Sequence, residues 1–130
     1  MEATASLLKP IRVLIADDHR LFAEALEAIL GVDDRIAVVG YASDGQEAID
    51  LVRELTPDVV LMDISMPVLD GIEAAQAIRD QVDHVSILML TGSSSRADVD
   101  RARAAGAAGY VTKDRVAAEL IDAIVEIATG

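Results

Sequence analysis

Polar side chains with complementary chemistry follow four apolar segments of this chain. Asp17-Asp18 follows the first such segment, and Asp63 follows the third. Thr91 and Lys113 follow the fourth and the fifth. Carboxylates that are brought together repel one another, and a hard divalent cation such as Mg²⁺ relieves that repulsion. An ammonium and a hydroxyl group beside them could hold phosphoryl oxygens, so these residues predict Mg²⁺-dependent phosphoryl transfer to a carboxylate.

Each of these residues also has a simpler explanation. Asp17 and Asp18 could cap a following helix, and Asp63 could be an ordinary loop acid. The Thr91 hydroxyl could bond locally to the backbone, and Lys113 could be a surface charge. The whole set is more specific than its members, because every residue in it follows a strand-like segment directly.

The segments that position these residues alternate between two patterns. Short apolar runs, most of them rich in Val, Ile and Leu, predict strands buried on both faces. They are residues 11–16, 36–41, 58–62, 85–90 and 109–112. Helical spacing predicts helices over 19–30, from Asp44, from Asp70-Gly71, from near Ser95, and over about 115–128. Alternating strands and helices predict a doubly wound five-stranded parallel sheet with five helices. Ligands bind such sheets at the carboxyl ends of the strands, where the polar residues fall.

Length and composition narrow the class of protein. The 130 residues suit one domain, which we place at 11–130 after a tail at 1–10. The chain has a net charge of -12 and therefore lacks the basic surface that nucleic acid binding needs. The chain has no cysteine, so thiolate metal sites are excluded. No signal peptide and no apolar run of roughly 20 residues is evident, so we expect a cytoplasmic protein without membrane contact.

Four motifs resemble the receiver domain of bacterial two-component response regulators. They are Val13-Leu14-Ile15-Ala16-Asp17-Asp18, Pro57-Asp58-Val59-Val60-Leu61-Met62-Asp63 with Met66-Pro67, Leu90-Thr91-Gly92, and Gly109-Tyr110-Val111-Thr112-Lys113. The resemblance covers about residues 11–128 and implies the flavodoxin-like receiver fold. Ala16-Asp17-Asp18-His19 and Lys113-Asp114 are similar to the NarL/FixJ type within that family.

The resemblance implies a role for each matching residue. Asp63 would accept a phosphoryl group from a sensor histidine kinase. Asp18 and Asp63 would bind Mg²⁺ directly, with the backbone carbonyl of Ser65 as the third protein ligand. Asp17 would act on the metal largely through water. Thr91 and Lys113 would bind the phosphoryl group.

The resemblance also implies a switch and an output. Thr91 would move toward the phosphoryl group, and Tyr110 would enter the space it leaves. The chain would catalyse only its own phosphotransfer and dephosphorylation, so we do not expect an enzyme. NarL/FixJ-type regulators usually carry a C-terminal DNA-binding domain, so we expect contact with DNA only through a domain beyond Gly130. The wide apolar arc of the last helix suggests a homodimer on phosphorylation.

Other classes fit less well. A haloacid-dehalogenase-like phosphatase needs two aspartates separated by one residue after the first strand, whereas Asp17 and Asp18 are adjacent. A cobalamin-binding module needs Asp-x-His-x-x-Gly, and Phe22 stands at the glycine position. An interaction scaffold without phosphorylation stays open at this point. His19 fits the start of a helix better than a ligand.

Overall fold

The structure, a computed structural model, describes residues 9–92 and 96–129. These residues form five strands, five α-helices and one 3₁₀ turn in alternating order. The elements are β1 (Ile11–Ala16), α2 (Arg20–Leu30), β2 (Ile36–Ala42), α3 (Gly45–Leu55), β3 (Val59–Asp63), α4 (Gly71–Gln81), β4 (Ser86–Thr91), α5 (Arg96–Ala104), β5 (Gly109–Thr112), η1 (Lys113–Arg115) and α6 (Val116–Thr129). The tail expected at 1–10 and the helix start expected near Ser95 fall largely outside the described residues.

The strands form one parallel sheet in the order β2-β1-β3-β4-β5. All five residues of β3, in the centre, are buried, which explains its continuous apolar sequence. The chain runs from β1 to β2 on one side and then returns to β3 on the other. The carboxyl ends of β1 and β3 therefore meet at the switch point where such sheets bind ligands. The expected α/β fold is confirmed.

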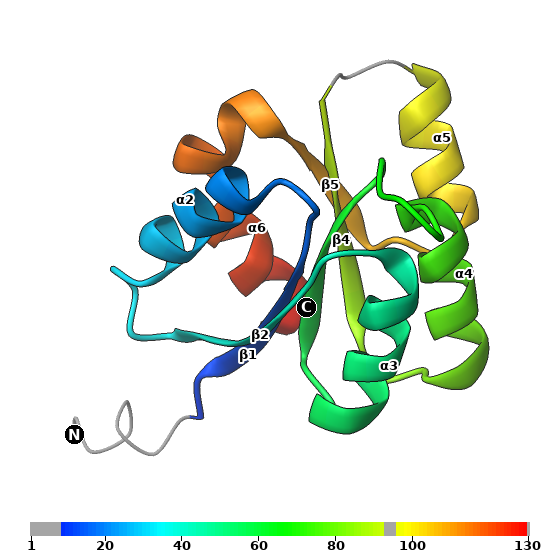
Figure 1. Cartoon of the computed structure of the whole chain (residues 1–130). Helices are drawn as coiled ribbons and strands as arrows, with labels where there is room; N and C mark the ends of the chain where they lie inside the picture. Colours follow the sequence, from blue (N-terminus) through cyan, green and yellow to red (C-terminus); the bar gives the residue numbers. More distant parts are fainter. Residues whose placement is uncertain (1–8, 93–95, 130) are drawn as a thin grey trace.

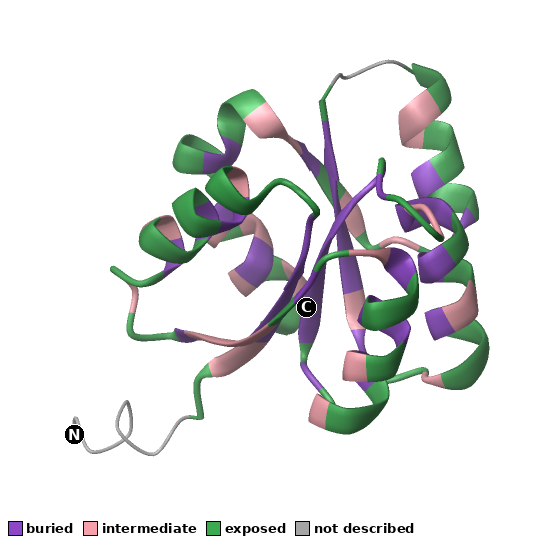
Figure 2. Ribbon diagram, viewed as in Figure 1, coloured by how far each residue is buried: buried purple, intermediate pink, exposed green. Residues whose placement is uncertain are grey.

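Helices cover both faces of the sheet (Figure 1). One hydrophobic core lies between the sheet and α3, α4 and α5, and it includes Val60, Met62 and Ile78. The other lies between the sheet and α2 and α6, and it includes Leu26, Leu61 and Leu120. Buried residues accordingly concentrate on the strands and on the inward sides of the helices (Figure 2).

Two helices begin as the sequence predicts. The Asp44 carboxylate accepts a hydrogen bond from the Glu47 N–H at 2.8 Å at the start of α3. Asp70 and Glu73 form a reciprocal capping box at the start of α4. Gly71 then packs so tightly that a Cβ there would overlap the Asp63 carbonyl oxygen. The start of α4 is thereby fixed against the end of β3.

Two element boundaries near the site differ slightly from the sequence prediction. Asp63 is the last residue of β3 rather than the first residue after it, because it still pairs with Leu90 of β4. Lys113 lies in the 3₁₀ turn η1, which the helical pattern alone did not predict. Within the described residues, no helix is both long enough and apolar enough to cross a membrane.

The last helix is only partly covered. Val116, Leu120 and Ile124 of α6 are buried against the sheet. Ile121, Val125 and other aliphatic side chains of α6 are half-buried. The wide apolar arc expected from the sequence therefore exists, but Ile121 and Ile127 on it still pack against the core.

Candidate functional site

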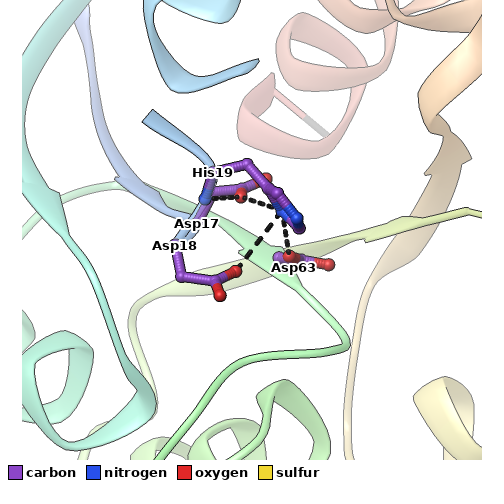
Figure 3. Close-up of side chains that lie close together, drawn as sticks. All are labelled: Asp17, Asp18, His19 and Asp63. Atoms are coloured by element: carbon purple, nitrogen blue, oxygen red, sulfur yellow. Dashed lines mark hydrogen bonds and ion pairs between the residues drawn. The ribbon is translucent and has the colours of Figure 1, made fainter. Parts of the chain in front are cut away.

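Two buried carboxylates lie side by side at the carboxyl edge of the sheet. Asp17 follows β1 and is 5% exposed, and Asp63 ends β3 and is 3% exposed. They are neighbours because β1 and β3 pair directly, with Ala16 opposite Met62. Asp18 lies beside them with a more exposed side chain (Figure 3). The structure therefore brings together the three acids that the sequence singled out.

Local backbone N–H groups orient the two buried carboxylates. Asp17 Oδ1 accepts from the His19 N–H at 2.8 Å, and Asp63 Oδ1 accepts from the Ser65 N–H at 3.2 Å. The second oxygen of each, Oδ2, is buried and has no hydrogen-bond partner among the described residues. The N-cap of α2 is His19, whose side chain makes no capping hydrogen bond. Asp17 thus does not cap the first turn of α2, and its carboxylate is available to the site.

Lys113 brings an ammonium to the cluster. Its Nζ lies 3.3 Å from Asp17 Oδ2 and 3.3 Å from Asp63 Oδ2. Burial and the nearby Asp17 charge raise the pKa of Asp63, and the Lys113 charge and the Ser65 N–H oppose that rise. One ammonium against three carboxylates leaves a surplus of negative charge. This arrangement of oxygen donors fits a divalent cation such as Mg²⁺.

An aromatic ring supports Lys113 from the side of α2. Lys113 Nζ lies 4.7 Å from the centre of the Phe22 ring, which is a cation–π geometry. No role for Phe22 was predicted from the sequence. The available signal was its rarity, because aromatics make up only 2% of the chain.

The residues expected to respond to phosphorylation lie at the next strands. Thr91 ends β4, is 2% exposed, and pairs with Thr112 of β5. Tyr110 is 38% exposed and lines a cavity of about 260 Å³ with Val99 and Arg103 of α5. Thr91 is therefore inside the molecule at the carboxyl edge, whereas Tyr110 lies on the outer side of β5.

His19 is the N-cap residue directly before α2, close to the helix start that the sequence predicts, but its imidazole also lies among the acids (Figure 3). The contact with the carboxylates was not predicted. It depends on the side-chain conformation of His19, which sequence spacing does not determine.

The match to known families agrees with this geometry. The model of the response regulator receiver domain matches residues 13–125. The chain therefore belongs to the response regulator receiver family.

Its relatives are transcriptional regulators of the NarL, DegU and LiaR type. LiaR of Bacillus subtilis is 42% identical over 120 residues, which are 92% of this chain and 57% of LiaR. DegU of Brevibacillus brevis is 37% identical over 120 residues, which are 92% of this chain and 51% of DegU. The chain thus spans about half the length of the curated relatives it matches. The receiver domain of Mycobacterium tuberculosis NarL superposes with a TM-score of 0.90 at 35% identity, covering 95% of this chain and 99% of that one.

Proposed function

We propose that the chain is a phosphorylation-switched receiver that takes a phosphoryl group on Asp63 from a sensor histidine kinase. The observation that carries this proposal is the placement of Lys113 Nζ at 3.3 Å from both Asp17 and Asp63. A phosphoryl group on Asp63 would add negative charge beside a carboxylate, and the Lys113 ammonium offsets that charge. The chain acts only on its own phosphoryl group, so it is not an enzyme with an external substrate.

The Asp63 carboxylate is the nucleophile in the proposed reaction. A bond forms between Asp63 Oδ and phosphorus while the bond from phosphorus to the kinase histidine nitrogen breaks. The product is an acyl phosphate on Asp63 and a free imidazole on the kinase. Water later cleaves the acyl phosphate, which returns the Asp63 carboxylate and inorganic phosphate.

The metal of this reaction is proposed to be Mg²⁺. Asp17, Asp18 and Asp63 would hold it with the backbone carbonyl of Ser65, Asp17 largely through water. Bound Mg²⁺ would neutralise charge on the transferred phosphoryl group. The charge balance supports this assignment, because the buried Oδ2 atoms of Asp17 and Asp63 share the single Lys113 ammonium while Asp18 adds a third carboxylate.

The switch is proposed to run through Thr91 and Tyr110. The Thr91 hydroxyl binds a phosphoryl oxygen, and Tyr110 moves inward from its exposed position. A hydrogen bond to a charged group contributes about 1.5–3 kcal/mol, enough to shift a balanced two-state equilibrium roughly 10- to 100-fold. The changed surface, over α5, β5 and α6, controls dimerisation and an output domain that binds DNA in the cytoplasm.

Phosphorylation in vitro tests this proposal. Acetyl phosphate with Mg²⁺ should add one phosphoryl group, which intact-mass measurement detects and which a chelator should prevent. Asp63→Asn should accept none. Equal phosphorylation of Asp63→Asn would refute the assignment of Asp63.

A further inference from the structure

The imidazole of His19 is partly exposed to solvent, but its Nδ1 lies close to the carboxylates of the cluster. Its Nδ1 is 3.3 Å from Asp17 Oδ1, 3.4 Å from Asp18 Oδ1 and 3.9 Å from Asp63 Oδ2. One potential ligand atom from each of these four residues lies within 4.8 Å of the others. Figure 3 shows the ring directed into the space between the acids.

These separations match ligands that share one ion. Nitrogen and oxygen ligands lie roughly 2.1 Å from a divalent metal, so two of them at right angles are roughly 3.0 Å apart and two on opposite sides roughly 4.2 Å apart. The distances from His19 Nδ1 to Asp18 Oδ1 and Asp63 Oδ2, the two side chains proposed to bind the metal directly, fall between these values. Asp17 Oδ2 and Asp63 Oδ2 are buried and share one ammonium, Lys113 Nζ at 3.3 Å from each, so the three carboxylates of the cluster still carry a surplus of negative charge.

We propose that His19 is a direct metal ligand through Nδ1, and that the site therefore binds transition-metal ions that favour nitrogen more tightly than Mg²⁺. This inference rests on the proposed function, because it extends the same metal site. Mg²⁺ prefers oxygen ligands and gains little from an imidazole. Mn²⁺, Co²⁺ and Ni²⁺ accept imidazole nitrogen with increasing affinity in that order. The rival account is that the His19 imidazole only contacts the carboxylates of the metal-free site and moves away when a metal binds.

Electron spin echo spectroscopy of the Mn²⁺-loaded chain separates the two accounts. We expect modulation from a directly bound ¹⁴N nucleus in the unaltered chain. The modulation should vanish in His19→Ala and persist in His84→Ala. His84 is a matched control, because it is the only other histidine and its side chain is 64% exposed against 65% for His19. Absence of nitrogen modulation in the unaltered chain would overturn the proposal.

Metal affinities give a second test that does not depend on spectroscopy. His19→Ala and His19→Gln should weaken Ni²⁺ binding at least about 10-fold and Mg²⁺ binding less than about twofold, since only Ni²⁺ loses a preferred ligand. Calorimetric titration measures both. An equal loss for the two metals, or none for either, would contradict nitrogen ligation.

The two proposals can fail separately. If Mg²⁺-dependent phosphorylation of Asp63 is found while Mn²⁺ shows no bound nitrogen, only the role of His19 is wrong. If His19 binds the metal while Asp63 accepts no phosphoryl group, only the proposed function is wrong.

Discussion

Helices α4 and α5 cover the same face of the sheet but are held to it very differently. Helix α4 buries Gly71, Ile72, Ala74, Ala75 and Ile78 and begins with a full capping box. Helix α5, among the described residues, buries only Ala102. Both pack against the core that contains β3 and β4. Among the described residues, the difference is therefore one of packing rather than of position in the fold.

This contrast matches the two tasks of a receiver. The start of α4 is tied to the acceptor strand, since the Gly71 N–H donates to the Ile64 carbonyl at 2.9 Å directly after Asp63. Helix α5 instead borders the cavity beside Tyr110. An element with few buried contacts opens at low free-energy cost. If the proposed function holds, the molecule keeps the carboxylate of Asp63 fixed and leaves the surface formed by α5 and β5 easy to move.

The largest expected effect tests the contact between the start of α4 and the end of β3. Gly71→Ala places a methyl group on the Asp63 backbone carbonyl, where neither partner can yield. We expect a loss of about 4 kcal/mol or more in unfolding free energy, at the high end for single substitutions. Gly92→Ala is the control, because its new Cβ would meet no atom within 4 Å. Urea denaturation measures both, and a mild effect at Gly71 would show that the start of α4 can shift.

Cavity formation compares the two helices directly. Ile78→Ala in α4 removes a fully buried side chain and should cost about 3 kcal/mol. Val99→Ala in α5 removes a half-buried one and should cost less than about 1 kcal/mol. The same denaturation experiment applies, with hydrogen exchange of α4 and α5 amides as a second measure. Equal losses in the two helices would remove the contrast between them.

Sequence patterns predicted the fold and the acids of the site because both depend on backbone periodicity. Buried parallel strands read as apolar runs, and their carboxyl ends must meet at one edge. Asp17, Asp63 and Lys113 could therefore be placed at one edge of the sheet, because each follows a predicted parallel strand. Element boundaries were less certain, as Asp58 shows. Its carboxylate accepts from the Arg12 N–H at 2.8 Å, and β3 begins one residue later.

Contacts that depend on side-chain conformation were not predictable in this way. His19 could have pointed to solvent, and Phe22 could have been an ordinary core residue of α2. Their contacts with the acids and with Lys113 arise only when α2 packs on the sheet and η1 turns above it. Periodicity places a residue on a face of a helix, but the rotamer decides which neighbour it reaches.

A third prediction concerns the negative charge of Asp63 at the end of β3. Because burial and Asp17 raise the pKa of Asp63, the folded chain binds a proton there more tightly than the unfolded chain. Stability should fall as pH rises from the unfolded pKa of about 3.8 through the higher folded value. Asp63→Asn should therefore stabilise the metal-free chain at neutral pH, on the order of 1 kcal/mol.

The pH dependence supplies the control for that substitution. The gain from Asp63→Asn should disappear below pH of about 3.8, where the carboxyl is protonated in both states. Excess Mg²⁺ should also reduce the gain, because it stabilises the unaltered native state by binding. Thermal melts across pH, with and without Mg²⁺, measure both. A gain that stays constant with pH would mean that charge at Asp63 is not its cause.

The smallest expected effect tests the contact between Lys113 of η1 and Phe22 of α2. Lys113 lies in η1, directly after β5, yet its ammonium lies over Phe22 of α2 and beside Asp63. A cation–π contact at a partly exposed site contributes about 0.5–1 kcal/mol.

Two substitutions test this contact. Phe22→Leu keeps most of the apolar packing and removes the ring, and Lys113→Met keeps the stem and removes the charge. A double-mutant cycle of unfolding free energies should give a coupling of that size. Added salt should leave this coupling free energy unchanged, because the Phe22 ring carries no net charge. A coupling near zero would mean that the acids alone hold Lys113.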